Sequence, residues 1–274
     1  LLINRNQLLF HLTAVARFNT VHSVVTVAEE LQKPVIVMLY PGHCIDFHWS
    51  TPAAFAGMAA TEAKRAKVPV SIHLDHSSDP AYIKAAIDAG FPSVMYDGSM
   101  LTPEENSKNT REVAEYAHAH GAEVEAELGC VGFTSNETDQ SNVDMYTTPE
   151  TAKRFCEESQ CDSLAVAIGS AHGYYTKMPK LDLERLQAIN AVTDIPLVLH
   201  GGSGIPDDQL EKAFTMGINK FNVGTEFLGL YFKTVVQYAE KYKDDPNHII
   251  LDMAVPVQDA LMNYLRQKLQ LCKL

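Results

Sequence analysis

Three histidines in this chain each lie at or just beyond the end of a short apolar run. His76 follows the run at 68–74, His172 follows the run at 163–169, and His200 ends the run at 195–200. Such runs are typical of strands that are buried on both faces in a parallel sheet. Because the carboxyl ends of these strands share one edge, the three imidazoles could converge there. A single histidine in such a position is more often structural, but three ligands with an open position are typical of catalytic zinc.

Asp75 directly precedes His76, so an acid capable of carrying a proton lies beside a candidate metal ligand. The alternative is a strand end with a capping aspartate and a surface histidine. His73 lies two residues earlier, and we interpret it as a hydrogen-bonded core histidine. His43 and His48 flank a loop after an earlier strand and could line the same site.

Two glycine-containing segments follow the last two expected strands and predict a phosphate site. They are Gly201-Gly202-Ser203-Gly204 and Asn222-Val223-Gly224-Thr225. In barrels of parallel strands, a phosphate is often held between the loops after strands seven and eight. Backbone N–H groups, two hydroxyls and the start of the following helix would supply the donors. The alternative is that each glycine only permits a tight connection.

Short β-branched runs alternate with longer amphipathic stretches, which predicts repeated βα units and a parallel sheet. We expect strands at 15–19, 34–39, 68–74, 93–96, 123–129, 163–169, 195–200 and 220–223. Helices are expected between them, with one more at 249–271. The pattern predicts an α/β fold, a TIM (β/α)8 barrel with an additional C-terminal helix, in a single domain over residues 1–274. The rival is an open doubly wound sheet, but the GxGxxG that would support it is absent after the first strand.

Composition limits the classes of partner. The net charge is −12 and Lys and Arg are not clustered, which argues against nucleic-acid binding. No apolar run approaches the roughly 20 residues of a membrane span. Five cysteines without a CxxC indicate reduced thiols, and we expect a cytoplasmic protein. A small phosphorylated substrate remains compatible with this acidity, because backbone amides can hold a phosphate locally.

Two further features concern residues 123–148. Glu123, Glu125 and Glu127 alternate along one strand, so they point to one side, either the barrel interior or the helix layer. A long polar segment follows at 130–148. Loops of that length are commonly functional, and we expect a mobile active-site loop there.

Several motifs together resemble the class II, zinc-dependent ketose-bisphosphate aldolases, the family of fructose-bisphosphate and tagatose-bisphosphate aldolases. They occur in the family's order and cover most of the chain. The motifs are HLDH (73–76), DAGFPSVMYDGS (88–99), EAELG (125–129), DSLAVAIGSAHG (162–173), PLVLHGGSG (196–204) and NVGTE (222–226).

The resemblance implies a reversible cleavage of a ketose 1,6-bisphosphate to dihydroxyacetone phosphate and glyceraldehyde 3-phosphate. It implies that His76, His172 and His200 hold Zn²⁺, that Glu127 lies close enough to join them, and that Asp75 is the proton donor and acceptor. It further implies a monovalent cation, Na⁺ or K⁺, near Gly173 and Gly201. The implied substrate contacts, with Asn19 as an additional candidate, are Gly173, Gly201, Gly202, Ser203, Asn222, Val223, Gly224 and Thr225. The long C-terminal helix indicates a homodimer or homotetramer, as in the relatives.

The chain departs from the family pattern at several positions. The loop after EAELG lacks the usual Gly-Gly and acidic pair, and Glu137 is the match for the base that deprotonates the ketone. The segment at 19–29 is shorter than usual. Tyr40 stands where a small hydroxyl residue often helps to hold the phosphate. Gly224 replaces the aspartate of many fructose-bisphosphate enzymes, so the preferred ketose stays open.

Four other functions are alternatives to a metal-dependent ketose-bisphosphate aldolase. A Schiff-base aldolase needs a lysine inside the barrel, and the run at 163–169 has none, while Lys220 is expected at the amino end of its strand. A zinc hydrolase of the amidohydrolase type would carry an H-x-H after the first strand, which this chain lacks. An aldolase acting on a different ketose 1-phosphate and a non-catalytic sugar-phosphate-binding barrel are the remaining alternatives.

Overall fold

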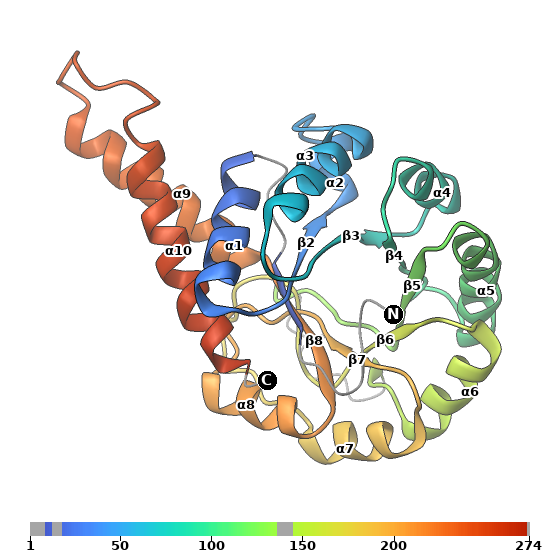
Figure 1. Ribbon diagram of the computed structural model, residues 1–274. Helices are drawn as coiled ribbons and strands as arrows, with labels where there is room; N and C mark the ends of the chain where they lie inside the picture. The colour runs from blue at the N-terminus through green and yellow to red at the C-terminus, as the bar shows by residue number, and fades with distance from the viewer. Residues whose placement is uncertain (1–8, 13–17, 136–144, 273–274) are drawn as a thin grey trace.

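Eight parallel strands form a closed barrel in the computed structural model, which describes residues 9–12, 18–135 and 145–272. Each strand pairs with its neighbour in sequence, and β8 pairs with β1 (Figure 1). The prediction of an α/β fold built from parallel strands is therefore confirmed. The strands are β1 (Leu9–Leu12), β2 (Val35–Leu39), β3 (Val70–Ser77), β4 (Ser93–Tyr96), β5 (Glu123–Leu128), β6 (Ser163–Val166), β7 (Leu197–Leu199) and β8 (Ile218–Val223).

Helices connect consecutive strands and form the outer layer of the barrel (Figure 1). Four of them begin where the sequence predicts, because a capping side chain precedes a proline in the first turn. Thr51, Asp79, Thr102 and Thr148 each accept a backbone N–H in this way. The helices are α1 (Phe18–Leu31), α2 (Pro41–Ile45), α3 (Pro52–Arg65), α4 (Pro80–Asp88), α5 (Pro103–Ala119), α6 (Pro149–Ser159), α7 (Leu183–Val192), α8 (Asp207–Thr215), α9 (Thr225–Tyr242) and α10 (Ala254–Leu271).

The first expected strand is wrong. Phe18 and Asn19, which were assigned to it, open helix α1, and the described strand lies earlier at Leu9–Leu12. The β-branched and aromatic character of the later run favoured the wrong segment, because propensity alone cannot tell a strand from a buried first helical turn. The expected C-terminal helix also begins later, at Ala254 instead of residue 249.

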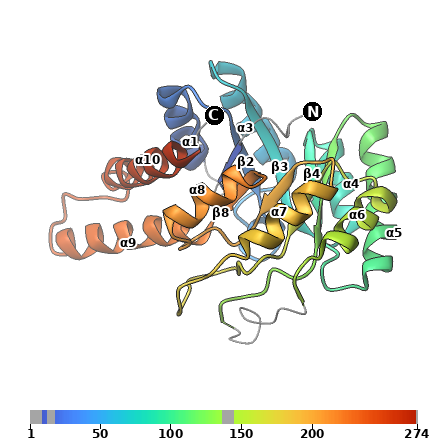
Figure 2. The same ribbon diagram turned by 90° about the horizontal axis from the view of Figure 1, so that it is seen from below.

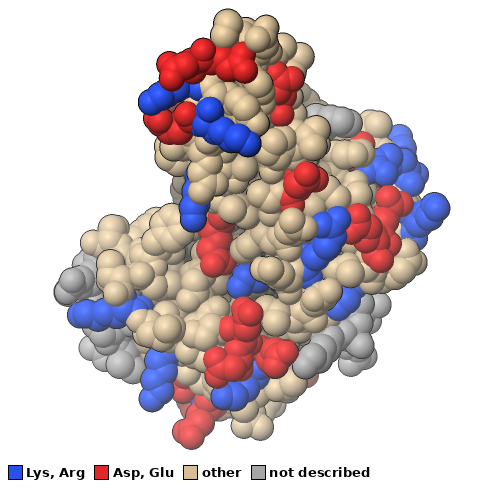
Figure 3. All heavy atoms as spheres, turned by 90° about the vertical axis from the view of Figure 1, so that its left-hand side faces the viewer, with Lys and Arg blue, Asp and Glu red and all other residues tan. Residues whose placement is uncertain are grey.

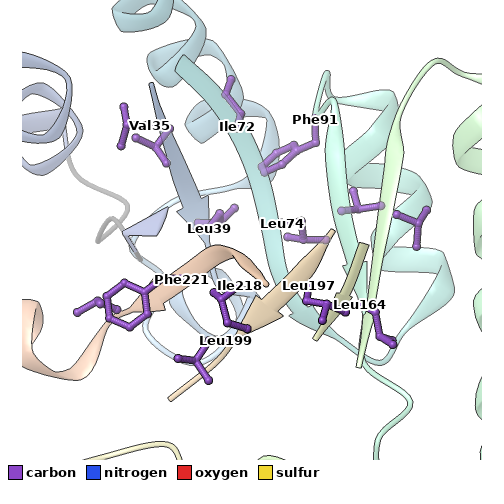
Figure 4. Packing of buried hydrophobic residues seen from close by; sticks show 14 of the residues in the cluster. Val35, Leu39, Ile72, Leu74, Phe91, Leu164, Leu197, Leu199, Ile218 and Phe221 are labelled. Atoms are coloured by element: carbon purple, nitrogen blue, oxygen red, sulfur yellow. The ribbon is translucent and has the colours of Figure 1, made fainter. Parts of the chain in front are cut away.

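The main hydrophobic core lies between the strands and the helices, because alternate strand residues point outward. On β2, Val35, Val37 and Leu39 belong to this core, whereas Ile36 and Met38 form a separate cluster on the other face. Figure 4 shows Leu74 on β3, Leu164 on β6 and other core residues projecting from the strands.

The other face of several strands is polar, although it is fully enclosed. His73, Ser93, Glu125 and Lys220 alternate with core residues on β3, β4, β5 and β8, and all four are buried. The alternation along β5 therefore turns Glu125 and Glu127 to the barrel interior and not to the helix layer. Buried charges must be paired, and this requirement shapes the site described below.

Helices α9 and α10 form a long antiparallel pair that extends beyond the barrel (Figures 1 and 2). The inner part of α10 packs against α1, where Lys33 Nζ donates to the carbonyl oxygen of Leu269, 3.0 Å away. Acidic and basic side chains are interspersed over this side of the molecule (Figure 3). The terminal helix is thus part of the folded core at one end and exposed at the other.

Two general findings bear on the sequence expectations. Within residues 9–12, 18–135 and 145–272, no helix has the length and apolar character that a membrane crossing requires. None of the five cysteines, all of which the structure describes, forms a disulfide.

We predict that α10 contributes to global stability through its inner face. Leu261→Ala removes a fully buried side chain and should lower the free energy of unfolding by about 2–5 kcal/mol. Val255→Ala, on the same helix but 63% exposed, should change it by less than about 0.5 kcal/mol. Equilibrium denaturant unfolding measures both, and equal effects would contradict this assignment of the core.

Candidate metal and active site

A cavity of about 500 Å³ opens at the carboxyl ends of the strands. It collects residues from β3, β5 and β8 and from the loops that follow β2, β4, β6 and β7. Its walls combine polar groups, glycines and a partly apolar rim. The lining residues are Tyr40, His43, Asp75, His76, Ser78, Asp97, Ser99, Met100, Glu127, Cys130, Val131, Phe133, His172, Gly173, His200, Gly201, Gly202, Ser203, Asn222, Gly224, Thr225 and Leu228.

The four expected metal ligands come together in this cavity. One ligand atom from each of His76, Glu127, His172 and His200 lies within 4.8 Å of the other three. The Nε2 atom of His76 is 2.7 Å from the Nδ1 atom of His200. The His172 ring centroid lies 4.9 Å from that of His76 and 5.9 Å from that of His200. Three imidazoles that are far apart in sequence therefore face one point.

A β-bulge lets Asp75 and His76 face the cavity together. Neighbouring strand residues normally point to opposite faces, yet both of these line the cavity. The pairing of β3 with β4 shifts between Leu74 and Ser77, and His76 has a φ of 44°. A left-handed conformation at a non-glycine residue costs roughly 1–3 kcal/mol, which the surrounding packing must offset.

Asp97 orients the ring of His76. Its Oδ2 atom accepts a hydrogen bond from His76 Nδ1 at 2.8 Å, so Nε2 is directed at the other ligands. Burial opposes a charge on His76, but Asp75 and Asp97 outweigh it and raise the pKa of His76 to about 10. For Asp97, burial works in the opposite direction to the hydrogen bonds from His76 and Ser99, which hold the pKa of the carboxyl well below its usual range. The carboxylates thus give this point a strongly cation-favouring environment.

Glu127 and His172 complete the candidate ligand set in different ways. Glu127 Oε1 accepts from the backbone N–H of Val131 at 3.1 Å, while Oε2 is buried and has no hydrogen-bond partner among the described residues. Burial, reinforced by Asp97, raises the pKa of Glu127 to about 8. The backbone of His172 is fixed by Gly132 and Thr134, and burial with the nearby His76 lowers the pKa of its ring to about 3.

These residues fit a bound divalent metal ion. Neutral imidazole nitrogens and one carboxylate oxygen are donors that transition metals accept. The buried Oε2 atom of Glu127, which has no hydrogen-bond partner among the described residues, is a donor that such an ion would engage.

Asp75 lies beside this cluster and is held by Asn222. The Nδ2 atom of Asn222 donates to Asp75 Oδ1 at 3.1 Å, and its own Oδ1 is buried without a partner among the described residues. Burial raises the pKa of Asp75 above its usual value, although His76 and Lys220 oppose the shift. The amide therefore connects the candidate proton carrier with the carboxyl end of β8.

The expected phosphate-binding segments lie together on one wall of the cavity. Gly202 must be glycine, because a Cβ there would come within 2.0 Å of the Phe221 ring. Its N–H donates to the carbonyl oxygen of Asn222 at 3.1 Å, which joins the two loops. The Ser203 hydroxyl accepts from the N–H of Glu226 in the first turn of α9 at 3.1 Å. The positive end of α9 is thus directed at this wall.

Some expected site residues lie elsewhere. Asn19 is in the first turn of α1 and is not among the described residues that line the cavity. The side chain of Val223 packs in the hydrophobic core, so only its backbone could serve a ligand. Glu137 lies outside the described residues. His43 and Tyr40 line the cavity, whereas His48 does not.

The expectation for Lys220 is wrong. Its side chain is fully buried inside the barrel, where Nζ lies 2.5 Å from Glu125 Oε2. The register of β8 turns this residue inward, and the pairing with Glu125 makes its burial tolerable. It does not line the cavity, so this correction adds no Schiff-base lysine to the site.

Sequence reasoning overlooked two residues that organise the site. Asp97 directly follows β4, so the rule that was applied to the histidines would have found it. The Tyr175 hydroxyl donates to the Gly201 carbonyl oxygen at 2.9 Å and accepts from the Ala171 N–H at 2.7 Å. No sequence signal predicts this bridge, because it links two loops across the rim.

Comparisons with known proteins agree with the fold and identify the family. The family model "Fructose-bisphosphate aldolase class-II" matches residues 4–274. The YdjI aldolase from Escherichia coli K12 is 32% identical, with a TM-score of 0.83 over 99% of this chain and 93% of that chain. A putative fructose-1,6-biphosphate aldolase from Coccidioides immitis is 28% identical, with a TM-score of 0.82 over 98% and 92%.

A third structure supports the fold alone. Fructose-bisphosphate aldolase (Fba) from Campylobacter jejuni is 22% identical, with a TM-score of 0.77 over 97% of this chain and 90% of that chain. The family model matches nearly the whole chain, and the first two structures are similar to it in sequence as well as in fold. The chain therefore belongs to the class II fructose-bisphosphate aldolase family and is an aldolase.

Proposed function

We propose that this aldolase is zinc-dependent and reversibly cleaves a ketose 1,6-bisphosphate, fructose or tagatose, on a TIM (β/α)8 barrel. The products are dihydroxyacetone phosphate and glyceraldehyde 3-phosphate. The observation that carries the proposal is the convergence of His76, Glu127, His172 and His200 within 4.8 Å, with Asp75 in the same cavity. Three histidine nitrogens with one carboxylate oxygen close by suit zinc better than magnesium or calcium, which prefer oxygen ligands.

The proposed mechanism uses the chain's residues to move one proton and to hold one phosphate. Zinc, when bound, supplies a Lewis acid for the negative charge that develops on the substrate oxygens. Asp75 takes the proton of the C4 hydroxyl in cleavage and returns it in condensation. Since Asn222 holds Oδ1 of Asp75, we assign the proton transfer to Oδ2.

Binding of the phosphate would fix the reacting carbons relative to Asp75. We assign this role to the backbone N–H groups of the loops after β7 and β8, with Ser203 and Thr225 on the same wall. Gly173 and Gly201 each have positive φ and lie at the adjacent rim, and we propose a monovalent cation near them. Glu137 is our proposed base for the ketone's proton.

A second candidate function has an observation in its favour. The cavity is lined in part by Met100, Phe133, Leu228 and Tyr40, and no lysine or arginine is among its described lining residues. Such a wall suits an uncharged aldehyde better than a phosphorylated one. The alternative is therefore an aldolase of the same mechanism that acts on a ketose 1-phosphate without a second phosphate.

We also propose that the chain forms a homodimer or homotetramer through the outer part of α9 and α10. Phe232, Ile250, Leu251 and Val255 are exposed on these helices or on the turn that joins them. An exposed apolar patch on an element that extends beyond the barrel is typical of an association surface.

Chelation should abolish cleavage, and added Zn²⁺ should restore it, because the ligand cluster would lose the ion that it holds. Fructose 1,6-bisphosphate, tagatose 1,6-bisphosphate and a ketose 1-phosphate should be assayed side by side by coupled detection of dihydroxyacetone phosphate. The 1,6-bisphosphate with the highest kcat/KM identifies the preferred ketose. Full activity in chelator would contradict the zinc dependence, and phosphate binding without any cleavage would favour a non-catalytic barrel.

Replacing Asp75 by Ala should lower kcat by roughly 10²–10⁴-fold, because general acid–base catalysis is lost. Zinc content, measured by elemental analysis, should stay at the wild-type level. Asp79→Ala is the matched control, since Asp79 caps α4 and is not a lining residue. Near-normal turnover in Asp75→Ala would remove this residue from its proposed role.

The double substitution Ile250→Asp/Leu251→Asp should shift the chain to the monomer in sedimentation velocity, because two buried charges would oppose association. Val192→Asp, at an exposed apolar position on α7, should leave the oligomer intact. An unchanged oligomer in the double variant would exclude this surface as the interface.

A further inference from the structure

A hydrogen-bonded column lies inside the barrel beneath the candidate metal ligands. His200 Nε2 is 2.8 Å from Glu125 Oε1, and Glu125 Oε2 is 2.5 Å from Lys220 Nζ. Lys220 Nζ is 3.5 Å from His73 Nε2, and His73 Nδ1 is 2.7 Å from Ser93 Oγ. All of these side chains are buried, and neither Glu125 nor Lys220 lines the cavity.

The column determines which nitrogen of His200 faces the metal ligands. A carboxylate paired with an ammonium group can only accept, so His200 Nε2 must carry the proton that it donates to Glu125. The Nδ1 atom then presents its lone pair, and this is the atom 2.7 Å from His76 Nε2. The contact with Glu125 fixes both the tautomer and the direction of the ring.

Lys220 determines in turn how Glu125 is oriented. It holds Oε2, so that Oε1 points at His200, and it compensates a charge that would otherwise be costly inside the barrel. His73 supports Lys220 from the other side. Burial together with the charge of Lys220 keeps the pKa of His73 well below its usual value, so a neutral ring can accept from Nζ at its Nε2 atom.

We propose that Glu125 and Lys220 are a positioning pair that sets the affinity of this aldolase for its metal ion through His200. Neither residue lines the cavity, so the pair would act only through His200. The inference rests on the proposed function in that the ion is zinc, and it adds two residues that the family resemblance assigned no role.

The isosteric variant Glu125→Gln provides a sharp test. In this variant Lys220 should attract the amide oxygen, so the amide N–H₂ group turns toward His200 Nε2. The ring must then accept at Nε2 and carry its proton on Nδ1, where it blocks metal binding. In the double variant Glu125→Gln/Lys220→Met the ammonium is absent, so the amide oxygen can turn back and accept from His200.

Metal-free proteins should be titrated with Zn²⁺ in competition with a chromophoric chelator, and their thermal unfolding should be recorded in parallel. We expect Glu125→Gln to raise the Kd for Zn²⁺ by roughly 10- to 100-fold. The Kd of the double variant for Zn²⁺ should return to within about threefold of the wild-type value, since the ligating tautomer is restored. The control Glu123→Gln changes a partly exposed residue on the same strand, and its Kd for Zn²⁺ should equal that of the wild type.

A purely structural role predicts a different pattern, in which the variants unfold at lower temperature but bind zinc with the wild-type Kd. That result, or a double variant no better than Glu125→Gln, would overturn the inference. A wild-type chain that binds no zinc would instead refute the proposed function. If Glu125→Gln does not fold, ¹⁵N-histidine NMR spectra of the zinc-loaded wild type test the proposal instead. A proton on Nε2 of His200 supports the proposal, and a proton on Nδ1 contradicts it.

Discussion

The buried ion pair between Glu125 and Lys220 is the interaction on which the rest of the site depends. A closed ring of parallel strands must fill its own interior, and here it does so with polar side chains instead of a fully apolar set. The two charges compensate each other at 2.5 Å, and the carboxylate has one oxygen left to hold His200. The same ion pair therefore fills the interior of the barrel and orients a candidate metal ligand.

A second constraint is the bulge at the end of β3. Regular strand geometry would send Asp75 and His76 to opposite faces, one into the cavity and one toward the helices. The shifted register and the left-handed φ of His76 turn both toward the cavity. Asp97, which directly follows the next strand, then fixes the ring of His76. Local strain at this point is what brings the candidate proton carrier next to a candidate metal ligand.

The opposite wall is built by close approach of backbones. Gly202 can lie against Phe221 and donate to Asn222 only because it lacks a side chain, and Ser203 connects to the start of α9. Asn222 then joins this wall to Asp75. The candidate metal ligands, the candidate proton carrier and the proposed phosphate wall thus lie around one cavity at the mouth of the barrel.

The sequence by itself determined the order and type of most elements, because capping residues and periodicity act locally, as at Thr51 and Thr102. It also predicted that His76, His172 and His200 would lie close together, as they do, since residues at the ends of parallel strands share one edge. Only the tertiary structure decided that Lys220 lies inside the barrel beside Glu125, that Tyr175 bridges two loops, and that Asp75 and His76 share a face. Strand register and long-range pairing fix these features, and neither is encoded in the residues nearby in the chain.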